Sequence, residues 1–105
     1  MAKFILSTNA QESLYDIKSY SKEHFGEQQT KIYIENIYKR MRKVAKNPKI
    51  GKKRDDILDG YYSIIAGSHI IYYTIKDTHI DIVDVLHQRM EPLRYPYEES
   101  NDSTD

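Results

Sequence analysis

Residues 60–87 read GYYSIIAGSHIIYYTIKDTHIDIVDVLH, and this stretch decides the fold. Three of its segments are rich in Ile, Val and Tyr, a composition typical of β-strands. These segments are residues 61–66, 69–75 and 79–86. The residues between them have the length of hairpin loops, and Gly67 in the first central position of its loop suits a type II′ turn. The pattern predicts an antiparallel meander of three strands.

Helical periodicity precedes the meander. A first helix, residues 9–24, begins at a capping box formed by Thr8-Asn9 with Gln11 and Glu12 and stops at Gly26. Its core stripe is Ala10, Leu14, Ile17, Ser21 and Phe25. A second helix runs from near Glu27 to Asn47-Pro48. Its core stripe is Thr30, Tyr33, Ile34, Ile37, Met41, Val44 and Ala45. Because the connector at Gly26 is so short, the two helices must fold back as a hairpin.

Residues 3–7 read as a short first strand, so the element order is β-α-α-β-β-β. We predict an α+β fold of two layers, in which the helix hairpin packs on a mainly antiparallel sheet. We predict that residues 1–97 form one domain. Residues 98–105, EESNDSTD, carry four acids and no base, and we predict that they form a disordered acidic tail.

Composition narrows the possible functions. The chain has no cysteine, which excludes disulfides and thiolate metal sites. No apolar run is long enough for a signal peptide or a membrane span, so we expect a cytoplasmic protein without a membrane partner. A metal site built from His69, His79 and His87 lacks further ligands, and no Gly-rich phosphate loop is present. We expect neither a metal nor a cofactor.

Charge is unevenly distributed. Without the tail, 16 basic residues face 12 acids (16 minus the four of the tail), a balance of +4. Residues 39–54 contain nine bases and no acid. This basic run could bind nucleic acid or the ribosome, dock an acidic protein segment that folds as it binds, or be an ordinary solvated helix face.

An ordered series of short motifs spans residues 3–92. It comprises a helix ending in Phe-Gly, then Asn-Pro-x-x-Gly, Gly-Tyr-x-Ser, Gly-Ser-His-x-Ile-x-Tyr and Val-Leu-His-x-x-Met. In this order the series resembles the ParE-type toxins of the RelE/ParE superfamily, which belong to bacterial toxin-antitoxin and plasmid-stabilisation systems. The resemblance implies a type II toxin that is not an enzyme, that inhibits DNA gyrase, and that is silenced by a cognate, ParD-like antitoxin. DNA would be contacted only through the antitoxin.

RelE-type members of the same superfamily instead cut mRNA on the ribosome, and this is the alternative function. Such chemistry needs an acid, a base and cations near the phosphate. The candidates are Lys53, Arg54, Tyr73, His87 and Arg89. Asp84 stands where the resembling family commonly places an arginine, and a carboxylate there would repel phosphate. For His87 we favour a structural role, in which it ends the last strand and hydrogen-bonds to nearby backbone while Met90 packs under the helices.

Two binding surfaces follow from these considerations. Tyrosines on both faces of the meander, Tyr61, Tyr62, Tyr72 and Tyr73, should leave an aromatic surface uncovered. The residues expected to bind the antitoxin are Ile32, Tyr38, Arg42, Lys46, Arg54, Tyr62 and Tyr72. The family resemblance places target contact near the C-terminus, so Arg89, Met90, Leu93 and Arg94 are the residues expected to bind gyrase. Packing of that segment on the domain is the alternative.

Overall fold

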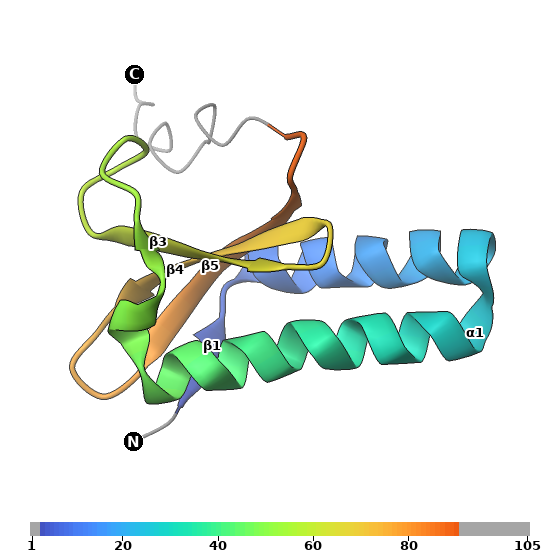
Figure 1. The fold of residues 1–105 in the computed structure, drawn as a ribbon, viewed down its shortest axis with the longest axis horizontal. Coiled ribbons are helices and arrows are strands. Elements are labelled where there is room, and N and C mark those ends of the chain that lie inside the picture. Colours follow the sequence, from blue (N-terminus) through green and yellow to red (C-terminus); the bar gives the residue numbers. More distant parts are fainter. Residues whose placement is uncertain (1–2, 91–105) are drawn as a thin grey trace.

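The computed structural model describes residues 3–90, which form an α+β fold of two layers, as predicted (Figure 1). A five-stranded sheet has the order β1-β5-β4-β3-β2. The elements are β1 (Phe4–Leu6), α1 (Thr8–Lys46), a 3-10 turn (Pro48–Ile50), β2 (Lys52–Lys53), β3 (Tyr61–Ala66), β4 (His69–Ile75) and β5 (Ile80–His87). None of the helices among residues 3–90 is long and apolar enough to cross a membrane.

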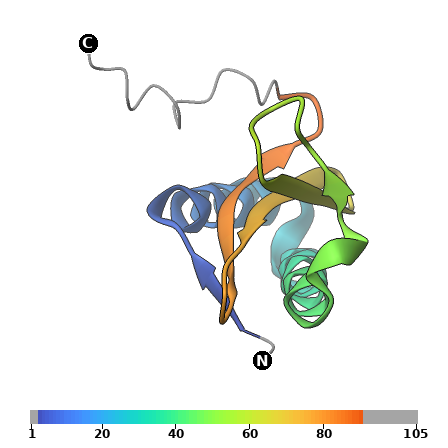
Figure 2. The ribbon, with the colours of Figure 1, turned by 90° about the vertical axis from the view of Figure 1, so that its left-hand side faces the viewer.

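Gly26 divides α1 into two arms, residues 8–25 and 27–46. Its backbone has φ 86° and ψ 169°, a conformation that is essentially restricted to glycine. The chain reverses there, and the arms run antiparallel (Figure 1). Figure 2 shows the second arm nearly end-on against one side of the twisted sheet. The predicted helix hairpin is therefore confirmed.

The first arm is capped one residue earlier than predicted. Ser7, not Thr8, is the N-cap, and its hydroxyl accepts a hydrogen bond from the backbone N–H of Ala10 at 2.9 Å. The same hydroxyl donates to the Val83 carbonyl at 2.7 Å, which ties the start of the helix to β5. The helix ends at Lys46 with Asn47 as its C-cap, directly before Pro48, as the sequence predicts.

The meander agrees closely with the prediction. β3 and β4 have the predicted bounds, and β5 begins and ends one residue later than predicted. Gly67 has φ 63°, the positive φ that a type II′ turn requires at its first central position. No described non-glycine residue has a positive φ. Two features were not predicted: the parallel pairing of β1 with β5 and the short edge strand β2.

Side chains from both layers form one core. The buried members are Ala10, Leu14, Ile37, Met41, Val44, Ala45, Ala66, Ile71, Tyr73, Ile80, Ile82 and Val85. Phe25 was expected in this core but is 64% exposed, because the ends of the arms extend beyond the sheet. The expectation of an uncovered tyrosine surface is also wrong for most of its members, since Tyr61, Tyr72 and Tyr73 are buried.

Candidate functional site

An open groove of about 900 Å³ lies between the two arms and the end of the sheet. We call it the arm groove. The first arm contributes Asp16, Ile17, Tyr20, Ser21 and Phe25, the second arm Gln29 and Tyr33, and the sheet Ser68, His69 and His87. Most of its lining is apolar, whereas its sheet end carries polar side chains. A groove of this character suits the apolar face of a segment of another protein.

Tyr33 fixes the second arm to the β3–β4 turn and thereby shapes the groove. Its hydroxyl accepts a hydrogen bond from the Ser68 N–H at 2.9 Å and lies 2.6 Å from His69 Nδ1. The ring packs so closely on Gly67 that a Cβ there would lie 2.7 Å from a ring carbon. Glycine thus serves this turn twice, through its positive φ and through its missing side chain.

His69 and His87 face each other across β4 and β5 at the sheet end of the groove. Their ring centroids are 5.3 Å apart, with the rings nearly perpendicular. Burial, and secondarily the charge of His87, lower the pKa of His69. His87 ends β5, and its Nδ1 accepts a hydrogen bond from the Arg89 N–H at 3.1 Å. These contacts support the structural role predicted for His87, but Met90 does not pack under the helices, since it is 52% exposed.

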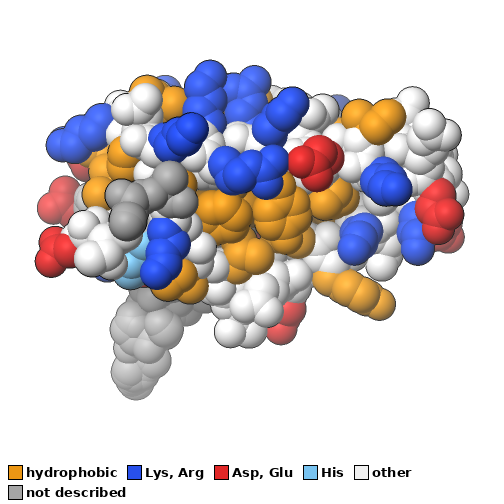
Figure 3. Space-filling view, turned by 90° about the horizontal axis from the view of Figure 1, so that it is seen from below, with side chains coloured by type: hydrophobic (Ala, Val, Ile, Leu, Met, Phe, Trp, Pro, Cys, Tyr) orange, Lys and Arg blue, Asp and Glu red, His pale blue; other side chains and the backbone are white. Residues whose placement is uncertain are grey.

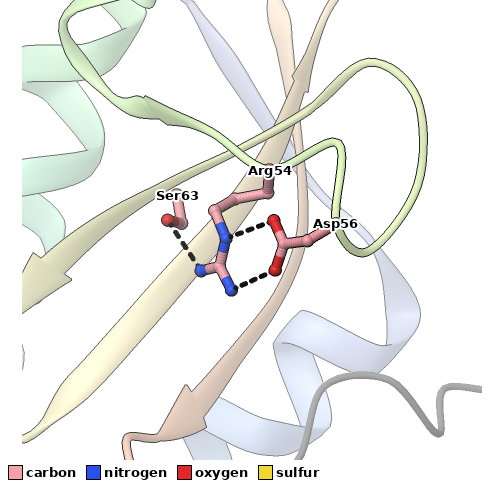
Figure 4. Close-up of polar contacts among 3 residues, drawn as sticks. All are labelled: Arg54, Asp56 and Ser63. Carbon is pink, nitrogen blue, oxygen red and sulfur yellow. Dashed lines mark hydrogen bonds and ion pairs between the residues drawn. The ribbon is translucent and has the colours of Figure 1, made fainter.

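A second polar cluster lies on the sheet face opposite the helices (Figure 4). Arg54 donates to both carboxylate oxygens of Asp56 at 3.1 and 3.0 Å and to Ser63 Oγ at 3.2 Å. Its guanidinium lies 5.7 Å from the ring centroid of Tyr72. The hydrogen bond to Asp56 raises the pKa of Arg54, and it lowers the pKa of the Asp56 carboxyl. We call these residues the Arg54 cluster.

Asp84 is held by hydrogen bonds within the fold. It is buried, and its Oδ1 accepts hydrogen bonds from Ser13 Oγ at 2.6 Å and from the Val85 N–H at 2.8 Å. The register of β4 and β5 shifts between Tyr72 and Tyr73, next to the Asp84 pairing. The carboxylate therefore joins the first arm to an irregular part of β5.

The structure does not bring the five nuclease candidates together. Tyr73 is fully buried on the helix-facing side, where its hydroxyl donates to the Pro48 carbonyl at 2.7 Å. Burial raises its pKa to about 12. Arg54 is paired with Asp56 on the sheet face opposite the helices. His87 lies at the sheet end of the groove, and Arg89 follows it in the chain. Its strand partner His69 is four residues, or about 13 Å, from Tyr73 along β4, so His87 is far from Tyr73. Lys53 is exposed on β2, with Nζ 4.0 Å from Asp55.

The residues expected to bind the antitoxin fall on three surfaces. Ile32, Tyr38, Arg42 and Lys46 belong to the second arm, where Ile32 is exposed and Arg42 pairs with Glu35 at 3.0 Å. Arg54 and Tyr72 lie on the opposite sheet face, and Tyr72 is only 3% exposed. Tyr62 stacks on Tyr73 on the helix-facing side, with ring centroids 5.6 Å apart.

Of the residues expected to bind the target, Arg89 and Met90 are exposed at the end of β5, whereas Leu93 and Arg94 lie outside the described residues. The three histidines do not converge, because His79 bonds to Asp81 at 3.0 Å near the start of β5. No group of three or more potential metal-binding side chains occurs within residues 3–90.

Sequence reasoning missed the arm groove as a site. It assigned Ile17, Ser21 and Tyr33 to the core stripes and did not consider Asp16, Tyr20 or Gln29. A usable signal was the presence of aromatic and polar side chains, Tyr20, Phe25 and Gln29, close to Gly26 on both arms. The pairing of Tyr33 with His69 could not be read from spacing, since 36 residues separate them.

Comparison with known proteins identifies the family. Residues 4–92 match the model of the ParE toxin of the type II toxin-antitoxin system parDE. Toxin ParE1 of Mycobacterium tuberculosis is 35% identical over 91 residues, which cover 86% of this chain and 93% of that protein. Toxin ParE1 of Caulobacter vibrioides is 30% identical over 90 residues, with the same coverage.

A solved structure shares the fold. It is described as the chromosomal ParDE TA system from P. aeruginosa, and the match has a TM-score of 0.72 and covers 83% of this chain and 96% of that one. At 13% sequence identity this likeness concerns the fold alone. The family match and the two ParE1 relatives carry the assignment: the chain belongs to the ParE family of type II toxins.

Proposed function

We propose that this ParE-family toxin acts by binding DNA gyrase, without catalysis, and that a cognate antitoxin neutralises it by covering the arm groove and the basic second arm. The observation that carries the first part is the separation of the polar groups that a nuclease would need. Tyr73 is buried and bonded to the Pro48 carbonyl, and Arg54 is paired with Asp56 on the other sheet face. Neither is free to act on a phosphate near His87.

The groove supports the second part. Between the arms, the half-buried Ile17 and the exposed Tyr20 and Phe25 offer apolar surface. A band of hydrophobic side chains crosses the underside of the molecule, and Lys and Arg side chains border it (Figure 3). An acidic segment with regularly spaced apolar residues matches such a surface in both respects, since its carboxylates meet the bases while its apolar side chains leave water. Ile32, Tyr38, Arg42 and Lys46 are our proposed contacts.

The proposed target contacts lie at a different place. Arg89 and Met90 project into solvent directly after β5, and Leu93 and Arg94 follow them in the sequence. Exposed arginine together with a large apolar side chain is a common pairing at protein interfaces. An antitoxin in the arm groove would lie next to His87, three residues before Met90, and could block access to this segment.

Two assays in parallel test the mode of action: supercoiling by purified gyrase, and ribosome-dependent translation with primer extension on the message. We expect inhibited supercoiling and intact message. Asp56→Ala sharpens the test, because it removes the carboxylate that pairs with the Arg54 guanidinium and leaves that guanidinium able to bind phosphate. A nuclease should then cut faster, whereas a gyrase inhibitor should leave the message uncut. Cleaved message with normal supercoiling would establish the RelE-type alternative instead.

Neutralisation is tested with the antitoxin encoded next to the toxin gene. Lys46→Glu on the second arm should weaken its binding several-fold, and more strongly at low salt. Lys76→Glu, an exposed lysine between β4 and β5 that lies outside the basic run and does not line the groove, is the matched control and should leave the affinity near that of the unmodified toxin. Equal effects of both changes would argue against a specific acidic contact at the second arm.

A further inference from the structure

His87 occupies a position between the arm groove and the turn that follows β5. One side of its ring faces His69 at the sheet end of the groove. Its Nδ1 accepts the Arg89 N–H. Two backbone bonds complete the turn, from the Gln88 N–H to the Ser68 carbonyl at 2.9 Å and from the Met90 N–H to the His87 carbonyl at 2.9 Å. A change in the His87 ring therefore affects both its contact with His69 and its hydrogen bond to the turn.

The two histidines have different hydrogen-bond partners. Because His87 Nδ1 accepts a backbone N–H, that nitrogen carries no proton and the ring is neutral. At His69, the Tyr33 hydroxyl accepts the Ser68 N–H and lies 2.6 Å from His69 Nδ1 and 3.4 Å from the Ala66 carbonyl, so its hydrogen can be donated to either acceptor. The other titratable groups that line this part of the groove are Asp16 and Tyr20 of the first arm.

The two rings respond differently to a proton. If His69 is protonated, the Tyr33 hydroxyl can accept from Nδ1–H and turn its hydrogen to the Ala66 carbonyl, which is 3.4 Å away, so the contact survives. Burial and the charge of His87 also lower the pKa of His69, so this ring stays neutral to lower pH. If His87 is protonated at Nδ1, two N–H donors point at each other, and the bond to Arg89 must break.

We propose that His87 is a proton-operated latch that holds the turn at residues 88–90 when its ring is neutral and releases it when the ring is charged. Because lower pH favours the charged form of an imidazole, the latch opens as pH falls. The consequence for activity rests on the proposed function, in which Arg89 and Met90 contact the target. A released turn would present them in many orientations and weaken that contact.

The experiment uses the full, uniformly ¹⁵N-labelled chain without antitoxin or gyrase. NMR spectra between pH 8 and 5 follow the Arg89 amide and the histidine ring signals. We expect the Arg89 amide proton to shift upfield with a single midpoint that coincides with the His87 ring titration. His87→Gln keeps an acceptor that does not titrate, so the Arg89 shift should disappear. His24→Gln is the control, because His24 stacks on Tyr20 on the exposed part of the first arm. In this variant the Arg89 shift should persist.

Two results would overturn the latch: an Arg89 amide that ignores the His87 titration, or one that titrates equally in His87→Gln. If His87→Gln is poorly folded, His69→Gln provides a second variant, in which the Arg89 shift should persist because the latch belongs to His87. Failure of gyrase inhibition leaves these spectra unaffected, and failure of the spectra leaves the supercoiling assay unaffected. The latch and the proposed function can thus fail separately.

Discussion

Gly51 lies close to the Tyr73 side chain, where the segment after α1 meets the sheet. A Cβ at Gly51 would overlap the Tyr73 hydroxyl and lie 2.9 Å from the Ser63 carbonyl. The backbone of Gly51 is extended, at φ −73° and ψ 168°, so the conflict is steric. We expect Gly51→Ala to lower the free energy of unfolding by about 1–3 kcal/mol, as overpacking does. Urea unfolding at neutral pH measures it.

A double-mutant cycle isolates the contact. In the Tyr73→Phe background the hydroxyl is absent, so the additional effect of Gly51→Ala should be smaller than in the unmodified chain. It should not vanish, because the Ser63 carbonyl remains. Equal effects in both backgrounds would show that the ring hydroxyl is not what excludes a side chain at position 51.

Tyr73 also predicts a pH dependence of stability. Burial raises its pKa to about 12, above the value of about 10 in an unfolded chain. Its contribution is fully present below pH 10 and is lost as pH rises toward 12. Tyr73→Phe should remove this component, and at pH 7 it should cost about 0.5–1.5 kcal/mol through the lost hydrogen bond to Pro48. Urea unfolding at pH 7 and 11 measures both, with the exposed Tyr15→Phe as control.

Single residues were the least predictable level. The role of His87 at the end of the last strand followed from its position between an apolar run and a charged turn. The burial of Tyr72 and the exposure of Met90 and Phe25 did not follow from their positions in the sequence. Burial depends on what covers a side chain, and Tyr72 is covered by Arg54, which lies 18 residues earlier. Alternation along a strand gives the face of a residue but not its neighbours from other elements.

Among the elements, the hinge between the arms depends on one residue. Gly26 has φ 86° and ψ 169°, where a side chain is strained even though a Cβ would meet nothing within 4 Å. We expect Gly26→Ala to destabilise the fold by about 1–3 kcal/mol through the backbone alone. Gln28→Ala, an exposed position two residues into the second arm, should be neutral. Thermal unfolding of both variants measures the difference in stability. If Gly26→Ala is as stable as the unmodified chain, the arms tolerate another backbone conformation at their connection.

Elements with local signals were predicted well, and those fixed by distant pairing were not. β3 and β4 were predicted to the residue, because Gly67 and Ser68 punctuate them. β2 consists of two lysines without strand propensity, and it exists because Lys52 and Lys53 pair with Ser63 and Tyr62. The parallel partner of β1 lies more than 70 residues away, and nothing in FIL specifies it.

At the scale of the whole molecule, the arm groove explains why the site was harder to predict than the fold. Asp16, Tyr33 and His87 come from the first arm, the second arm and β5, and they share no sequence pattern. Each has an ordinary role when considered alone. The groove forms only because the arms extend past the sheet, so that aromatic residues near Gly26 have no layer beneath them. Periodicity marks the helix face that turns inward, but not where the opposing layer ends.

Two truncations test how the molecule divides its tasks. Within residues 3–90 the buried core residues all precede residue 87, and we expect removal of residues 91–105 to change the melting temperature by no more than a few degrees. Antitoxin binding should persist, because the arm groove and the second arm remain, whereas gyrase inhibition should be lost with Leu93 and Arg94.

The matched control removes residues 98–105 only. It deletes four acids and changes the net charge from 0 to +4 (16 bases against 16 − 4 acids), but it keeps the proposed target contacts. Supercoiling inhibition should therefore survive in this shorter deletion. Loss of inhibition in both truncations would assign the effect to the acidic residues, and retained inhibition in both would move target contact away from the C-terminus, with the exposed aromatic residues of the arms as the next surface to test.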